Sequence, residues 1–148
     1  MTLKDIKRAV SLALKEAYPN CKIYGSDTVE GYTRPSFFLY ITQTLSESTK
    51  NAKHKNVEIE IDYIQKRADE ADGIDFFSKV EELFGQKLCV GDRYLNVDNM
   101  RTDFEGENLN IPVVIFETEF WDTIKVTDNS EIAKKMIIKQ EVRKGDYQ

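Results

Sequence analysis

The chain has 148 residues, of which 41% are hydrophobic, and a formal net charge of −5. This length and apolar content predict one folded domain with a core. The acidic balance disfavours generic tight binding to nucleic acid, because phosphate neutralisation supplies most of that affinity. Cys21 and Cys89 lie far apart without metal-ligand spacing, which favours free thiols in a reducing compartment. The N-terminus lacks an apolar leader core and no stretch approaches 18 apolar residues, so we expect a cytosolic protein without a membrane span.

The first third of the chain predicts one helix and two strands. An apolar stripe at three- to four-residue spacing predicts a helix over residues 3–18, with a capping box at Thr2 and Asp5. A short strand is expected over Lys22–Gly25. Ser36–Leu45 is apolar on both faces, which is typical of a central strand.

A polar segment and a regular strand follow. Ser46–Asn56 is rich in Lys, Asn and Ser, which predicts a mobile loop. Val57–Ile64 alternates apolar and acidic residues, so it predicts an antiparallel strand with one solvated face. The two flanking strands are expected to form a hairpin around the loop.

A second helix is predicted over Asp72–Phe84, with Asp72 as its cap and Gly85 as a left-handed residue after its end. The expected apolar stripe of this helix is Ile74, Phe77, Val80, Leu83 and Phe84.

The remaining strands are predicted as two pairs. Lys87–Val90 and Tyr94–Val97 flank the hairpin signal Gly91-Asp92. Met100–Glu105 and Leu109–Val126 flank a second turn. The predicted order is therefore α-β-β-β-α-β-β-β-β, an α+β domain over residues 1–127 with a mostly antiparallel sheet and both helices on one face.

The segment Leu109–Val126 is expected to be unusually long for one strand. Eighteen extended residues span roughly 60 Å, whereas a domain of this size is about 40 Å across. Such a strand must bend, protrude, or pair outside its own subunit. Its distal half keeps Phe120, Ile124 and Val126 apolar on one face and also carries Trp121. We interpret this half as a candidate contact to another subunit, with a bent strand wrapping its own helix as the alternative.

Residues 128–148 are expected to form a C-terminal arm or a short helix. Their apolar residues are Ile132, Met136, Ile137, Ile138 and Val142. Docking of these residues on a neighbour and packing at home both remain open. Ile132 and Met136 are accordingly candidate partner contacts.

Little in the sequence indicates catalysis or a bound cofactor. His54 is the only histidine and lies between lysines, so the sequence favours a solvated residue over a triad member. The carboxylates around Gly73 fail the calcium-loop pattern, because the required final glutamate is Lys79. We expect no catalytic, metal or cofactor site, although paired carboxylates of a small hydrolase stay open as a minor alternative.

Positive side chains gather in the predicted loop at Lys50, Lys53, His54 and Lys55. In an acidic chain this basic loop is a candidate contact to DNA or to an acidic neighbouring protein. An ordinary solvated hairpin tip is the simpler interpretation.

Several stretches, taken in order, resemble the phage tail terminator family. They are Gly31-Tyr32-Thr33-Arg34-Pro35-Ser36-Phe37-Phe38, Val57-Glu58-Ile59-Glu60-Ile61-Asp62-Tyr63, Asn99-Met100-Arg101, the strand 113–121, and Ala133-Lys134-Lys135-Met136. Together they extend over most of the chain, although no single stretch is specific.

The resemblance implies a non-enzymatic α+β subunit that needs no cofactor and assembles as a hexameric ring. Such a ring caps the head-proximal end of the tail tube in a tailed phage, or in a tailocin of a Gram-positive bacterium. The implied partners are further copies of the chain, the tail tube protein and a head-completion or connector protein, with DNA passing without sequence specificity. Assembly would take place in the bacterial cytoplasm. Another head–tail connector or neck protein is the alternative.

Overall fold

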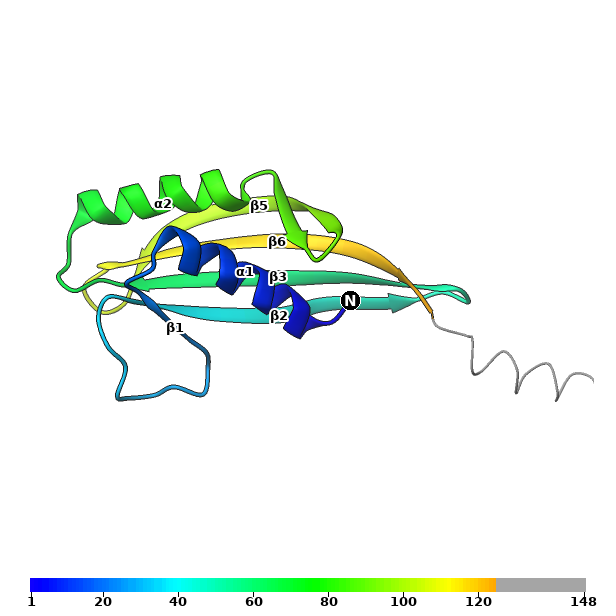
Figure 1. The fold of residues 1–148 in the computed structure, drawn as a ribbon, viewed down its shortest axis with the longest axis horizontal. Coiled ribbons are helices and arrows are strands. Elements are labelled where there is room, and N and C mark those ends of the chain that lie inside the picture. The colour runs from blue at the N-terminus through cyan, green and yellow to red at the C-terminus, as the bar shows by residue number, and fades with distance from the viewer. Residues whose placement is uncertain (125–148) are drawn as a thin grey trace, which may run out of the picture.

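Two helices and six strands make up residues 1–124, the part of the chain that this computed structural model describes (Figure 1). In chain order they are α1 (Leu3–Ala17), β1 (Lys22–Tyr24), β2 (Ser36–Ser48), β3 (Ala52–Ile64), α2 (Glu70–Phe84), β4 (Lys87–Val90), β5 (Arg93–Glu105) and β6 (Ile111–Thr123). The expected arm over 128–148 and the expected domain boundary at residue 127 lie outside the described residues.

The strands form one sheet in the order β1-β2-β3-β6-β5-β4. Only β1 and β2 run parallel, and every other neighbouring pair is antiparallel. The predicted α+β class and the order of elements are confirmed, with one change. The segments 94–97 and 100–105, expected as separate strands, are joined in β5 through a bulge at Asn99, whose φ is 53°.

Both helices cover the same face of the sheet, as predicted, and their buried side chains share one core with it. In α1 the stripe is Ile6, Val10 and Leu14, and the predicted capping box of Thr2 and Asp5 is present. Alternate residues of the strands meet these helices, because successive side chains of a strand point to opposite faces. The sheet's contribution is Phe37, Leu39, Val57, Ile59, Ile61, Tyr63, Leu88, Val90, Leu95, Val114, Phe116 and Phe120.

Three details predicted for α2 are wrong. Its cap is Asp69, whose carboxylate accepts from the backbone N–H groups of Ala71 and Asp72. Its buried side is Gly73, Phe76, Val80 and Phe84, so Ile74, expected in the core, is half exposed. Gly85 has φ −63° and not a left-handed value. The helix starts two residues earlier than predicted, which does not change which of its residues share a face. The sheet packs against the side that carries Phe76, whose ring stacks on Phe37.

The predicted mobile loop Ser46–Asn56 is also wrong. Strand β2 continues to Ser48 and β3 begins at Ala52, so only residues 49–51 form the turn. Thr49 closes it, since its hydroxyl and its backbone N–H both contact the Ala52 carbonyl. Polar composition misled the prediction, because this hairpin extends beyond the helices (Figure 1) and none of its residues 46–56 has to be buried in the core.

Strand β2 is not central, contrary to expectation. Its short neighbour β1 pairs only with Ser36–Phe38, and β3 and β6 occupy the middle of the sheet. The second apolar face of β2 has another cause. Phe38 packs against Tyr24 and Tyr32 on the face that the helices leave open.

Strand β6 is shorter than the predicted Leu109–Val126 and is not unusual in this sheet. It has 13 residues, as do β2, β3 and β5, and at about 3.3 Å per residue each spans roughly 43 Å. Leu109 lies in the preceding turn at φ 51°. The sheet as a whole is elongated, and β6 pairs on both sides within its own subunit.

Candidate subunit-contact site

The distal end of β6 divides its aromatic residues between the two faces of the sheet. Phe120 lies on the helix-covered face, is 4% exposed, and has the Arg93 guanidinium 5.7 Å from its ring centroid. Trp121 points to the open face and is 55% exposed. Of the predicted contact residues, Phe120 therefore packs inside its own subunit, Trp121 is accessible and Ile124 is half buried. Val126, Ile132 and Met136 lie outside the described residues.

His54 lies against Trp121 and is not the solvated loop residue that the sequence favoured. The two residues are direct partners across β3 and β6, and their rings stack at 4.6 Å with an interplanar angle of 21°. Glu47 lies 3.4 Å from His54 Nδ1, and Glu119 lies 3.1 Å from Nε2. The His54 side chain is consequently only 14% exposed. Three strands thus hold this ring in place.

The predicted basic loop is not one cluster in the structure. Lys50 lies in the turn, whereas Lys53 and Lys55 belong to β3 and pair with Asp122 and Phe120 of β6. Because residues alternate along a strand, these two lysines lie on the face opposite to His54. The four residues are therefore divided between the turn and two faces of the hairpin.

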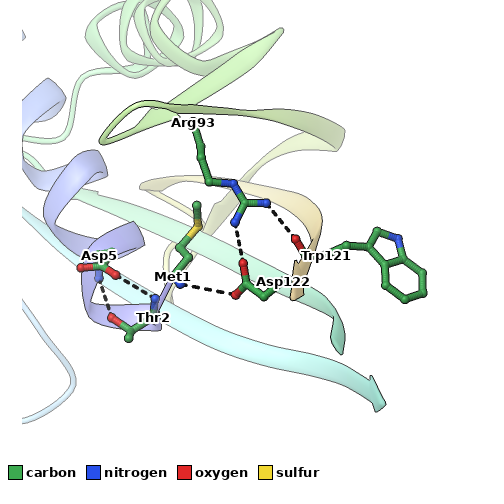
Figure 2. A network of polar contacts seen from close by, with 6 residues as sticks. All are labelled: Met1, Thr2, Asp5, Arg93, Trp121 and Asp122. Carbon is green, nitrogen blue, oxygen red and sulfur yellow. Dashed lines mark hydrogen bonds and ion pairs between the residues drawn. The ribbon is translucent and has the colours of Figure 1, made fainter. Parts of the chain in front are cut away.

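Arg93 ties the end of β6 to the β4–β5 hairpin, as Figure 2 shows. Its guanidinium donates to the Asp122 carboxylate and, over 2.9 Å, to the Trp121 carbonyl oxygen. The Met1 ammonium lies 3.4 Å from the other Asp122 oxygen. Burial acts to raise the pKa of Asp122, but the Arg93 hydrogen bond and the ammonium charge outweigh it and leave that pKa lowered. The backbone that carries Trp121 is thus fixed by a charged network.

A groove lies on the helix-covered side, next to this network. It has a volume of about 640 Å³ and runs between α1 and the β4–β5 turn. Leu12, which is 62% exposed, and Val90 give it an apolar lining, and Arg93 lies at its border. The groove and Trp121 therefore form two different surfaces on opposite faces of the sheet.

The open face of the sheet is acidic around Asp62. Burial, then the neighbouring Glu60 and Glu105, raise the pKa of Asp62 to about 8. One oxygen of its carboxyl group is buried without a hydrogen-bond partner. Arg101 offsets part of the charge, with its guanidinium 3.8 Å from the Glu58 carboxylate. The raised pKa favours the protonated form of this carboxyl group.

Within residues 1–124 no three His, Cys, Asp or Glu side chains gather as a metal site would require. No helix in that part of the chain is long and apolar enough to cross a membrane. Cys21 and Cys89 are free thiols, as expected.

Sequence reasoning named Trp121 as a candidate contact residue but missed the residues that surround it. Glu47, Glu119 and Arg93 come from three different strands, so their convergence depends on register that no local pattern encodes. The one available signal was the alternation of β6, which places Glu119 and Trp121 on the same face.

Comparison with known proteins places the chain in a family. No curated protein matches it significantly. One solved structure is similar over 84% of this chain and 97% of its own, with 12% identity and a TM-score of 0.47, a likeness too distant to carry an argument. The model of the family described as phage tail terminator protein matches residues 5–131. Since this match extends over most of the chain, the chain belongs to the phage tail terminator family, which is structural rather than catalytic and acts in tail assembly.

Proposed function

We propose that the chain assembles as a ring, expected to be a hexamer, on the head-proximal end of the tail tube. There it stops polymerisation of the tube and forms the joint to the head-completion or connector protein. DNA passes through the ring without sequence-specific contact, because a net charge of −5 gives no gain from counterion release. Assembly takes place in the bacterial cytoplasm, and the product is a phage or a tailocin particle.

The observation that carries this proposal is the exposed but immobilised Trp121. Large apolar residues that are held rigid and solvent-exposed are typical contact residues at protein interfaces. Stacking on His54 and the Arg93 bond to its carbonyl group fix Trp121 before any partner binds. The ordering cost of binding is therefore small.

A closed ring also requires two different surfaces on each subunit. Trp121 on the open face is one candidate, and the groove between α1 and the β4–β5 turn is the other. They lie on opposite faces of the sheet. A contact in which Trp121 of one copy meets the groove of the next copy is heterologous, because it joins two different surfaces.

Electron microscopy of tails assembled without this protein tests the terminator role. Tubes of uncontrolled length support termination. Tails of normal length that lack heads contradict it and favour a connector or neck protein instead. A purified protein that sediments as a monomer at every concentration, also with tail tube protein present, contradicts the ring.

The contact residue is tested by Trp121→Ala in the full chain. We expect loss of ring formation by sedimentation and loss of length control in assembled tails. Leu109→Ala is the matched control, because Leu109 is a large apolar residue that is 70% exposed in the turn before β6, at the end of the strand far from Trp121. If both variants form rings as the wild type does, Trp121 is not the contact.

A further inference from the structure

The distal end of the sheet carries charges of opposite sign on its two faces. It consists of residues 45–48 of β2, 52–56 of β3 and 119–123 of β6 (Figure 1). Directly opposed residues of neighbouring strands project to the same face, and successive residues of one strand project to opposite faces. The titratable residues that share the open face with Trp121 are Glu47, His54 and Glu119. Those on the other face are Lys53, Lys55 and Asp122.

The face that carries the two lysines is positively charged. Lys53 and Lys55 form no ion pair with any carboxylate of residues 1–124. Asp122 lies on the same face, but its carboxylate is already bound by Arg93 and by the Met1 ammonium. The charges of Lys53 and Lys55, together called the lysine face, are therefore available to an acidic partner.

The open face is negatively charged around Trp121. The side chains of Glu47 and Glu119 are 63% and 55% exposed, although each carboxylate contacts a ring nitrogen of His54. Even a fully protonated His54 ring carries a single positive charge, which offsets only one of these two carboxylates. Glu47, Glu119 and Trp121, together called the acidic face, thus join an exposed aromatic ring to a negative surface.

These charges determine which faces of two copies can meet. A contact between two acidic faces brings Glu47 and Glu119 against their own equivalents, and a contact between two lysine faces is repelled in the same way. An acidic face against a lysine face joins opposite charges. Such a contact is heterologous, so it builds a ring, whereas a two-fold dimer through either face is disfavoured.

The lysine face adjoins the groove of the proposed ring contact. Lys53 is the direct cross-strand partner of Asp122, and Asp122 binds Arg93 at the border of that groove. Figure 2 shows the Trp121 ring directed away from this network. One copy therefore presents Trp121 on one side and the groove with the lysines on the other.

We propose that the ring forms by contact of the acidic face of one copy with the lysine face of the next. This inference rests on the proposed ring and names the surface that receives Trp121. Exposed ion pairs add little affinity one at a time, so the charges chiefly determine which surfaces meet and how fast. Trp121 supplies the aromatic ring that the contact buries.

The test uses two double variants of the full chain. Lys53→Glu with Lys55→Glu makes both faces acidic, and Glu47→Lys with Glu119→Lys makes both faces basic. Each variant alone should need at least about tenfold more protein than the wild type to form rings in sedimentation, because like charges then meet at every contact. An equimolar mixture should assemble as the wild type does, because acidic and basic copies can alternate around a ring with an even number of subunits.

Lys66→Glu with Arg67→Glu is the matched control. It makes the same change in net charge as the lysine-face variant, at exposed positions between β3 and α2, and it should assemble as the wild type does. Lys53→Ala with Lys55→Ala removes the charges without adding repulsion. This milder variant should assemble more weakly than the wild type and with less dependence on salt.

Three results would overturn the charge contact while leaving the ring intact. They are a lysine-face variant that assembles as the wild type does, a mixture that stays monomeric, and a Lys66/Arg67 control that loses assembly to the same extent. A wild-type protein that forms no ring contradicts the proposed function itself, and the charge contact with it.

Discussion

The two ends of the same three strands are stabilised in different ways. Near the body, β2, β3 and β6 bury Phe37, Ile61 and Val114 beneath the helices. At the distal end, the strands extend past the helices and are held by the His54–Trp121 stack and the Arg93–Asp122 pair. The comparison teaches that one continuous sheet can provide a buried core at one end and hold an exposed aromatic ring rigidly at the other.

The largest expected effect lies at the body end. Phe116→Ala removes a fully buried ring that stacks on Phe84, and it should lower the free energy of unfolding by about 3–5 kcal/mol. Chemical denaturation measures this, with Trp121→Ala as the distal counterpart. An equal loss in both variants would erase the distinction between the two ends.

Arg93→Ala should have an intermediate effect. It leaves the partly buried Asp122 carboxylate and the Trp121 carbonyl group without their donor, which should cost about 1–3 kcal/mol. Arg93→Lys keeps the charge but not the forked geometry, so only part of the stability should return. A thermal melt of Arg93→Ala that matches the wild type would show that the network is dispensable.

Asp62→Asn should change how stability depends on pH. The folded pKa of about 8 exceeds the ordinary value of 3.8, so the folded protein keeps a proton that the unfolded chain releases. Stability from this group is present below about pH 4 and is lost as the pH rises to about 8. The difference in the free energy of unfolding between the variant and the wild type should therefore favour the variant by about 1–2 kcal/mol more at pH 8 than at pH 5, after a discount for solvent screening.

Urea denaturation at both pH values measures the Asp62 effect. Asp75→Asn, at an exposed position of α2, serves as the control for removing one carboxylate. If Asp62→Asn keeps the wild-type pH dependence, the carboxyl group is already ionised in the folded protein.

The smallest effect on stability is expected for Trp121→Ala. The residue is more than half exposed, so its loss removes chiefly the stack on His54, about 0.5–1.5 kcal/mol. Its effect on assembly should be far larger than its effect on the melting temperature. A strongly destabilised variant would instead make Trp121 part of the core.

Much of the fold was predictable because local patterns and tertiary packing agree. The alternation of Val57–Ile64 and the capping box at Thr2 both describe what the structure contains. The helix cap at Asp69 was missed because Asp72, three residues on, offers the same chemistry, and the structure uses Asp72 to accept from the Tyr63 hydroxyl. The polar hairpin was read as a loop because its residues are mostly polar and none of Ser46–Asn56 lies in the core.

The site was only partly predictable. Composition and periodicity named Trp121 as a candidate, and the structure shows it exposed, whereas its support comes from Glu47, His54 and Arg93, residues distant in sequence. Phe120 was expected on the surface because the sequence does not reveal that the β4–β5 hairpin folds back and brings Arg93 over its ring. Register and hairpin packing, rather than composition, decide such contacts.

Trp121 is the chain's only tryptophan, and this gives the protein a built-in optical reporter. The indole is in contact with water in the isolated subunit and with an imidazole on one side. Intrinsic fluorescence excited at the indole therefore originates from a single known position. Its emission should shift to shorter wavelength when another molecule covers this ring, so the kinetics of assembly can be followed without any attached label.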